Sequence, residues 1–377
     1  MKFRDFIPLS VKSKIAAHLT RCPAPNHQFL YKYCIFKVDR IGDFVLSLGA
    51  IRQIIDQCGS KNCVLLLSTV VKDLAENQFP NVKKIFVPAA GEALWKHAFT
   101  AYFGTRKEIA SYRFEYLISL KYHYEVYHRI VCSWVNAQHK ILSYSTSLST
   151  TPTEDPILAE LFEQTIPYPA NHTSNQCLEI KAHVQILTTL FGEDYSFNDA
   201  LPRLENICCT EKEYILFVPY GGESIRDFPQ ILWEELMDIA HEKGLPIKIC
   251  VAPKDEKRAQ ATIQRHFYGI AVNVAVESYK NLNDMVKAIA EAKWVCSVET
   301  SIAHIATALD KKLIALLGGG HYGYFAPWQK SKRQRWLINE IDCFGCGWKC
   351  IRNEPVCMTK IPRHKLRDAV EDLLASR

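Results

Sequence analysis

The chain has 377 residues, of which 48% are hydrophobic and 23% charged, with a formal net charge of +6. These values are typical of a soluble globular protein, and the length favours two domains. The charge is compatible with an anionic substrate or membrane surface but is too weak to indicate a nucleic-acid partner. The sequence contains no run of about 18 apolar residues, so it predicts no membrane span. Fourteen cysteines without a recognisable secretory signal predict mostly free thiols in a reducing compartment.

Residues 1–28 form a basic segment that we separate from the domains that follow. Val11, Ile15 and Leu19 repeat at helical spacing among lysines and arginines, as in helices that lie in a membrane interface. On that interpretation, residues 1–21 make peripheral contact with a membrane. An ordinary surface helix packed on the first domain is the alternative.

Apolar runs alternate with amphipathic stretches from residue 33 onward. Such alternation predicts βαβ units and a mainly parallel sheet. Pro202 to Thr210 is typical of a linker, so we assign residues 29–205 to the first domain. We expect strands at 33–38, 63–67, 84–87, 116–120 and 140–144, and helices near 43–56, 70–78, 92–110, 124–137, 155–164 and 177–191.

A second alternation begins at Tyr214 and predicts a second α/β domain over residues 210–342, followed by a Cys-rich loop and a C-terminal helix over residues 343–377. The predicted fold is therefore α/β, with two parallel-sheet domains that face a cleft. Within the second domain we expect strands at 214–218, 246–251, 270–275, 293–298 and 312–317, and helices near 230–243, 254–267, 281–292 and 301–309.

The stretch from Val38 to Ser47 joins the first strand to the first helix. Ligands bind at the carboxyl ends of strands in open α/β sheets, and this turn places Gly42 and Asp43 there. Asp43 lies in the first helical turn, where the helix dipole favours the ionised carboxylate, as suits a general base. Capping of the helix is the alternative role.

A second turn follows the strand that ends at Val218. Gly221 and Gly222 allow the backbone to approach a ligand closely, and Ser224 lies in the same turn. Arg226 stands just before a helix, where its guanidinium can hold a phosphate through two parallel hydrogen bonds. A surface ion pair with Asp227 or Glu223 is the alternative.

A third turn leads from a strand into a helix of small residues at Glu299, Thr300, Ser301 and His304. Free amides at that helix N-terminus can bind a diphosphate, to which the hydroxyls of Thr300 and Ser301 add donors. Glu299 suits sugar hydroxyls better than phosphate. We favour a structural role for His304, as a hydrogen-bonded core histidine.

Four cysteines, Cys343, Cys346, Cys350 and Cys357, follow one another closely in the tail. Four thiolates can hold a structural zinc or iron ion in a tetrahedral site. A paired zinc knuckle needs a second C-x₂-C, which the tail lacks. The alternative is a compact loop of free thiols.

The segments DRIGDFVLSLGAIRQI, VPYGGESIRDFPQILWEEL, SVETSIAHIATALDKKLIALLGG and CFGCGWKC…CMTKI occur in this order. Together they resemble the heptosyltransferase family of lipopolysaccharide assembly, glycosyltransferase family 9. The resemblance implies a GT-B architecture of two Rossmann-like domains, with the acceptor on the first and the donor nucleotide on the second. It also implies an inverting transferase that needs no catalytic metal.

The resemblance assigns roles to individual residues. Asp43 takes the position of the general base, and Arg226 takes the cationic position at the departing diphosphate. Thr300 and Ser301 fall on the phosphate-binding turn. Asp255 or Glu256 falls where an acidic residue holds the ribose.

The partners implied are a nucleotide diphosphate-sugar, ADP-heptose first, and a glycolipid or glycan acceptor of the cell envelope. Glu299 and Ser301 stand where well-known members have Asp and Gly, so another nucleotide sugar is the alternative donor. A degenerate protein that binds the sugar nucleotide without transferring it is a second alternative. The location implied is cytoplasmic, peripheral on the inner face of the bacterial inner membrane.

Overall fold

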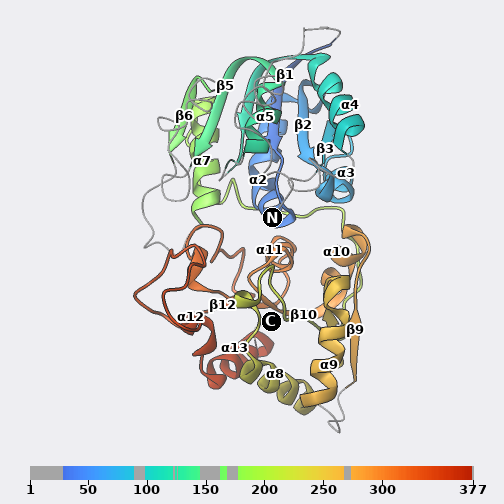
Figure 1. Cartoon of the computed structure of the whole chain (residues 1–377), viewed down its shortest axis with the longest axis vertical. Coiled ribbons are helices and arrows are strands. Elements are labelled where there is room, and N and C mark those ends of the chain that lie inside the picture. Colours follow the sequence, from blue (N-terminus) through green and yellow to red (C-terminus); the bar gives the residue numbers. More distant parts are fainter. Residues whose placement is uncertain are drawn as a thin grey trace, which may run out of the picture.

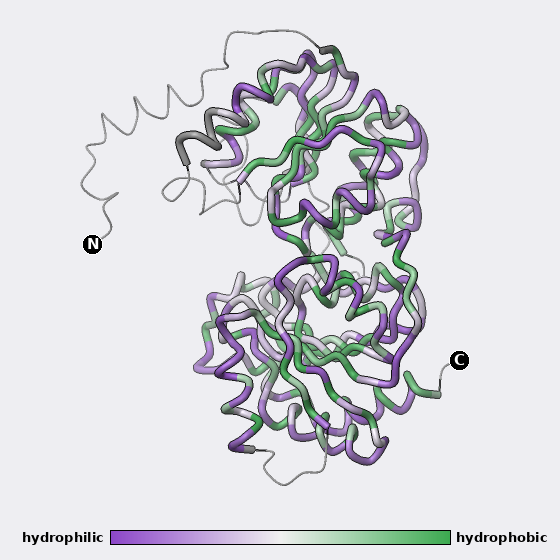
Figure 2. The backbone as a smooth tube through the Cα atoms, turned by 90° about the vertical axis from the view of Figure 1, so that its right-hand side faces the viewer, coloured by the Kyte–Doolittle hydropathy of each residue, from purple (hydrophilic) through white to green (hydrophobic). Residues whose placement is uncertain are grey.

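The computed structural model describes residues 29–88, 98–121, 124, 126–144, 162–167, 177–266 and 273–375. The predicted basic segment 1–28 and most of the helix expected near 155–164 lie outside these ranges. Two six-stranded sheets organise the described chain, one above the other in Figure 1. Apolar segments run through the interior of both halves in Figure 2.

The first sheet is parallel throughout, in the order β3-β2-β1-β4-β5-β6. Its strands are β1 (Phe29–Lys37), β2 (Cys63–Ser68), β3 (Lys83–Val87), β4 (Tyr112–Ser119), β5 (Asn136–Tyr144) and β6 (Gln164–Pro167). The helices of this half are α2 (Ile41–Cys58), α3 (Lys72–Gln78), α4 (Ala98–Ala110), α5 (Val126–Ser133) and α7 (Leu178–Phe191).

The strands of this sheet are buried on both faces. Ile35 packs in the cluster that contains α2, α3 and α7, whereas its neighbour Phe36 packs in the cluster that contains α5. Successive side chains of a strand point to opposite faces, and helices on both faces require near-continuous apolar runs. This is why the central strands were recognisable in the sequence.

The second sheet is also parallel, in the order β12-β11-β10-β7-β8-β9. Its strands are β7 (Lys212–Val218), β8 (Ile247–Cys250), β9 (Val274–Glu277), β10 (Ala292–Val298), β11 (Leu313–Leu316) and β12 (Gln334–Leu337). The helices are α8 (Gln230–Glu242), α9 (Glu256–His266), α10 (Leu282–Glu291), α11 (Ser301–Ala308), α12 (Val356–Thr359) and α13 (Arg363–Ala375). Counted within each half, both sheets have the Rossmann order 3-2-1-4-5-6.

Most predicted strands and helices are confirmed within a few residues. The exceptions are the edge strands β6 and β12, which were missed because edge positions are half-exposed and lack an apolar run. The helix predicted near 124–137 is also too long, since α5 ends at Ser133 and β5 begins at Asn136. In the described chain, no helix is both long and apolar enough to cross a membrane.

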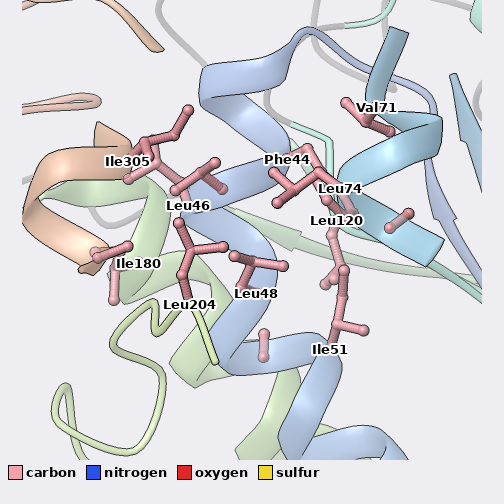
Figure 3. Close-up of a cluster of buried hydrophobic side chains, with 14 of the residues drawn as sticks. Phe44, Leu46, Leu48, Ile51, Val71, Leu74, Leu120, Ile180, Leu204 and Ile305 are labelled. Atoms are coloured by element: carbon pink, nitrogen blue, oxygen red, sulfur yellow. The ribbon is translucent and has the colours of Figure 1, made fainter. Parts of the chain in front are cut away.

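The two halves meet where α2 packs against α11. Leu46 of α2 and Ile305 of α11 are fully buried in one hydrophobic cluster (Figure 3). A Cβ atom added to Gly42 would lie 3.2 Å from the His304 ring and 3.5 Å from the Ser301 Cα. The first turns of the two helices are thus in contact, which brings the predicted Asp43 and Ser301 turns together.

Candidate active site

A cavity of about 1000 Å³ lies between the two sheets. Its walls are the segments that follow β1, β2 and β4 of the first sheet and β7 to β11 of the second. Both sheets therefore present the carboxyl ends of their strands to one space, as ligand sites of open α/β sheets do.

Most of the predicted site residues line this cavity, and two do not. Ser224 lies outside the lining and is exposed to solvent. Glu256 also lies outside it, where it accepts a hydrogen bond from Ser278. The predicted residues that line the cavity are Gly42, Asp43, Gly221, Gly222, Arg226, Asp255, Glu299, Thr300, Ser301 and His304.

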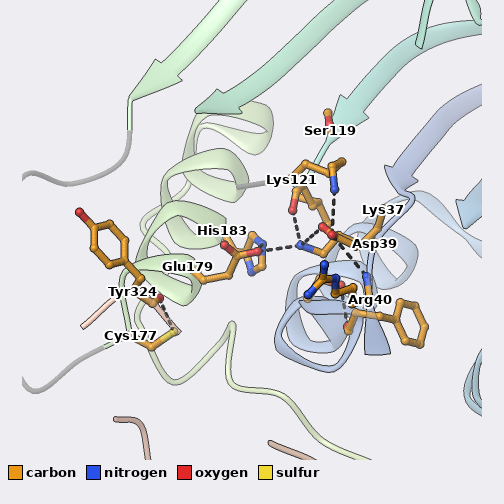
Figure 4. A network of polar contacts seen from close by, with 12 residues as sticks. Lys37, Asp39, Arg40, Ser119, Lys121, Cys177, Glu179, His183 and Tyr324 are labelled. Carbon is orange, nitrogen blue, oxygen red and sulfur yellow. Dashed lines mark hydrogen bonds and ion pairs between the residues drawn. The ribbon is translucent and has the colours of Figure 1, made fainter. Parts of the chain in front are cut away.

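The first wall is held by a network of buried charges (Figure 4). Lys37, whose side chain is fully buried, donates to the Leu120 carbonyl at 2.6 Å and to Glu179 at 2.7 Å. Asp39 bridges Lys37 at 3.4 Å and Lys121 at 2.8 Å. Because both lysines come from the ends of sheet strands and Glu179 from α7, the network fixes the loop that carries Asp43.

Asp39 and Asp43 are two carboxylates in very different environments. Burial alone would raise the pKa of Asp39, but Lys121 and Lys37 outweigh it and lower that pKa to about 2. Burial and the Asp39 charge raise the pKa of Asp43 to about 7, against the opposing effect of Lys37. Carboxylates whose pKa values are pushed apart in this way mark acid–base roles.

Asp43 lies in the first turn of α2, as predicted. Burial and the Asp39 charge raise the pKa of this carboxylate, and its position in the first helical turn does not reveal either effect. Among the described residues no hydrogen bond to its carboxylate is recorded, and the capping position belongs to Arg40. A partly buried carboxylate with a pKa near neutrality and a free lone pair suits a general base.

Arg226 and Glu299 form a charge pair on the opposite wall. Nη2 of Arg226 donates to the Glu299 backbone oxygen and to its Oε2, both at 2.7 Å. Arg226 is not paired with Asp227, the alternative considered from the sequence, because Asp227 instead accepts from Arg258 and from the Gly221 amide. These hydrogen bonds hold the guanidinium beside the turn that contains Gly221 and Gly222.

His304 has both ring nitrogens engaged by protein groups. Trp328 Nε1 donates to its Nδ1 at 3.1 Å, so the proton of the neutral ring lies on Nε2, 3.4 Å from Oε1 of Glu299. Burial would raise the Glu299 pKa, but the hydrogen bond from His304 and the charge of Arg226 outweigh it and lower that pKa. The structural role expected for His304 matches this arrangement.

The N-terminus of α11 faces the same cavity. Thr300 occupies the capping position, but its side chain makes no capping hydrogen bond and instead lies 3.4 Å from the Ser297 hydroxyl. The first amides of the helix consequently have no intrahelical acceptor. Together with the Thr300 and Ser301 side chains, they form a site suited to an anion.

The side chains of the aromatic segment between Tyr124 and Arg129 lie in two different environments. Tyr124 and Tyr127 are buried in the core of the first domain. His128 instead lines the cavity. Residues 122, 123 and 125 of the same run lie outside the described ranges.

The cysteine tail contains the four predicted metal ligands. Within the described ranges, which include all four cysteines, no group of three or more His, Cys, Asp or Glu side chains is placed to hold a metal ion. Cys350 Sγ lies by the Glu354 carbonyl, whereas Cys357 is buried beneath Gly319. None of Cys343, Cys346, Cys350 and Cys357 forms a disulfide, and a structural metal ion at these four cysteines stays a prediction.

Asp39, Lys121 and His321 are among the cavity residues that were not singled out from the sequence. Asp39 and Lys121 directly follow β1 and β4, so their position after a strand was a usable signal. His321 comes after the three glycines that follow β11, so its position after a strand was a usable signal as well. The ion pair between Asp39 and Lys121 had no such signal, because it joins residues far apart in the sequence.

The fold has the GT-B architecture, with two Rossmann-like domains around a shared cavity. Residues 120–348 match the model of glycosyltransferase family 9 (heptosyltransferase). This is more than half of the chain, which belongs to that family.

Relatives and solved structures agree with this assignment. The chain is 28% identical over 130 residues to lipopolysaccharide heptosyltransferase 1 of Escherichia coli (strain K12), covering 34% of this chain and 39% of that protein. It thus spans about two fifths of that relative's length. The structure of E. coli heptosyltransferase WaaC with ADP-2-deoxy-2-fluoro heptose has a TM-score of 0.64 at 16% identity, covering 90% and 99% of the two chains.

A family 9 glycosyltransferase from Veillonella parvula has a TM-score of 0.72 at 12% identity, covering 95% of this chain and 100% of that one. At such identities the likeness concerns the fold, and it extends over nearly the whole described chain.

Proposed function

We propose that this protein is an inverting glycosyltransferase that moves a sugar, heptose first, from a nucleotide diphosphate-sugar to a lipopolysaccharide or other cell-envelope glycan. The observation that carries the proposal is one cavity with Asp43 on the first wall and Arg226 on the second. A base and a fixed cation on opposite walls suit attack on one face of a sugar and departure of a diphosphate from the other.

Asp43 takes the proton of the acceptor hydroxyl as that oxygen attacks the anomeric carbon. One C–O bond forms, and the C–O bond to the diphosphate breaks on the opposite face, so the configuration inverts. A pKa of about 7 leaves a useful fraction of the base ionised while keeping it strong enough to accept a proton.

The leaving diphosphate gains charge as its bond breaks. Arg226 and the open amides of α11 are already oriented to meet that charge, and preorganised donors of this kind stabilise a transition state strongly. Asp255 lines the cavity whereas Glu256 does not, which favours Asp255 as the ribose-binding acid.

ADP-heptose is the donor we propose, since a solved structure of the same fold holds an ADP-linked fluoroheptose. We expect calorimetry and thermal shift to detect ADP-heptose in preference to UDP-, GDP- and dTDP-linked hexoses. Preference for another sugar nucleotide would reassign the donor, with Glu299 and Ser301 the first residues to test. Binding without transfer to any acceptor would favour the degenerate alternative, and binding of none would contradict the proposal.

The acceptor site in this proposal is the first wall of the cavity. Arg40 there is exposed, and its charge favours a glycan with anionic groups. Residues 1–21, outside the described ranges, are proposed to bring the enzyme to the cytoplasmic face of the membrane where such a glycolipid lies. Binding of the whole chain, and not of a chain lacking residues 1–21, to anionic vesicles would support this part.

Catalysis in this proposal uses no metal ion, because Arg226 and helix amides supply the positive charge at the diphosphate. We expect EDTA treatment to leave the transfer rate unchanged, and added Mg²⁺ not to raise it. A rate that falls with EDTA and recovers with Mg²⁺ would contradict the assignment. Elemental analysis of protein purified without a metal-binding tag tests the cysteine tail separately: stoichiometric zinc or iron would support a structural metal ion there, and the lack of either would contradict it.

A further inference from the structure

The Cys-rich loop packs against the backbone that follows β11. The Gly345 amide donates to the Gly319 carbonyl at 2.8 Å, and the Gly347 amide donates to the Gly320 carbonyl at 2.9 Å. A Cβ atom added to Gly318 or Gly320 would lie 2.0 or 2.5 Å from the indole of Trp348. The glycines therefore make room for this one side chain.

The backbone of Trp348 is unusual. Its φ of +63° lies in the left-handed region, which a bulky residue rarely adopts. Residues held in such conformations persist only where their surroundings require them, and they concentrate at functional sites. The loop thus holds Trp348 in one orientation at the cost of local strain.

The indole contacts two residues that line the cavity. The Arg226 guanidinium carbon lies 5.1 Å from the centre of the ring, within the range of a cation–π interaction. Its Nε1 donates to Nδ1 of His321 at 3.3 Å. Trp348 itself is outside the lining, so it acts on the cavity through these two neighbours.

The hydrogen bond from Trp348 fixes the tautomer of His321. An indole nitrogen only donates, so Nδ1 must carry the lone pair and Nε2 the proton. Burial lowers the pKa of His321, with Glu299 opposing and Arg226 reinforcing that shift, and the ring is neutral at pH 7. Among the described residues none accepts from Nε2, which leaves an N–H donor available to a ligand beside Arg226.

We propose that His321 is a second hydrogen-bond donor to the leaving diphosphate, and that Trp348 is the positioning residue that holds His321 in its Nε2–H form. This inference rests on the proposed function, since it assumes that a diphosphate departs beside Arg226. It gives the Cys-rich loop a role in catalysis that does not depend on a metal ion.

Isosteric variants of His321 separate a donor from a space-filling ring. The amide nitrogen of His321→Gln can reach the position of Nε2, whereas that of His321→Asn reaches only the position of Nδ1. A hydrogen bond to a charged group is worth about 10- to 100-fold. We expect His321→Asn to lower kcat by about that factor, His321→Gln to remain within several-fold of wild type, and the KM for the donor to change less than kcat.

Trp348→Phe keeps a ring over Arg226 and removes only the N–H. We expect it to lower kcat about fivefold, the value of one ordinary hydrogen bond, and to have little further effect in the His321→Gln background, which has no tautomer to fix. Trp233→Phe is the matched control: it removes an indole N–H from the same domain, outside the cavity lining, and should leave kcat unchanged.

The dissociation constant of ADP and the transfer rate of the wild type are measured alongside. If the wild type transfers sugar and all His321 variants match it, this inference is wrong and the proposed function stands. If Trp348→Phe slows the reaction equally in both backgrounds, the coupling to His321 is wrong. If the wild type neither binds ADP nor transfers sugar, it is the proposed function that fails.

Discussion

Asp43→Asn lowers kcat by about 10²- to 10⁴-fold, the range that general-base catalysis supplies. The amide keeps the shape of the carboxylate but cannot accept the acceptor's proton. Since Asp43 is assigned to the acceptor hydroxyl and not to the nucleotide, the dissociation constant of ADP-heptose should stay near the wild-type value. Steady-state kinetics together with calorimetry on the same preparation measure both quantities.

The pH dependence of the wild type gives an independent check. The base is active when ionised, and its pKa is raised to about 7, so kcat/KM for the acceptor should fall as the pH drops below about 7 and level off above it. Asn lacks this ionisation, and the variant's residual rate should not follow the same curve. A wild-type profile that is flat between pH 5 and 8 would contradict the role of Asp43.

We expect Asp43→Asn to raise the stability of the folded state although it lowers activity. The folded-state pKa of Asp43 is raised, so the protonated form is favoured by folding, and ionisation progressively destabilises the folded state as the pH rises from about 4 to about 7. Asp43→Asn removes this cost. We expect its Tm to exceed that of the wild type at pH 8 and to approach it at pH 4, which separates loss of the base from misfolding.

Arg226→Gln is expected to lower kcat by about 10²- to 10³-fold, the effect of losing one preorganised donor to a developing charge. It should also weaken donor binding, since the cation attracts the diphosphate in the ground state as well. Arg226→Lys keeps the charge but lacks the planar guanidinium, whose Nη2 donates to the backbone oxygen and to Oε2 of Glu299, and intermediate activity is expected.

The same substitution leaves the Glu299 carboxylate, with 8% of its side chain exposed, without its cationic partner. An unpaired buried charge is strongly destabilising, so the Tm of Arg226→Gln should fall. Adding Glu299→Gln removes that charge and should restore much of the Tm without restoring kcat. Recovery of activity in the double variant would show that Arg226 acts only through folding.

Arg363→Gln is a charge-matched control for Arg226→Gln. Arg363 lies in the same domain, pairs with Glu234 on the surface and is outside the cavity lining. Arg363→Gln changes the net charge equally, and exposed ion pairs contribute little to stability. If this variant has wild-type kinetics, the effect of Arg226→Gln comes from the position of Arg226 in the cavity and not from the change in net charge.

The turns after strands were predictable because their signals are local. Gly42 and Asp43 lie in the first turn of a helix that follows an apolar run. Gly221, Arg226 and Thr300 lie between an apolar run and a helix, and all five residues line the cavity. The parallel sheets follow from the same alternation.

The buried charge network was not predictable, since Lys37 meets Glu179 across 142 residues of sequence. The position of Asp43 in the first helical turn was visible in the sequence, but the burial and the Asp39 charge that raise its pKa were not. The role of Trp348 was not predictable for the same reason, because its contacts with Arg226 and His321 join residues far apart in the sequence.

The most direct test of the central claim is the anomeric configuration of the product. ADP-heptose and a lipopolysaccharide acceptor lacking heptose are incubated with the whole chain, and NMR of the isolated glycan determines the configuration of the new linkage. Direct attack by a hydroxyl that Asp43 has deprotonated predicts a configuration opposite to that of the donor. Retention of the donor's configuration would contradict the single-displacement mechanism and the role of Asp43 in it.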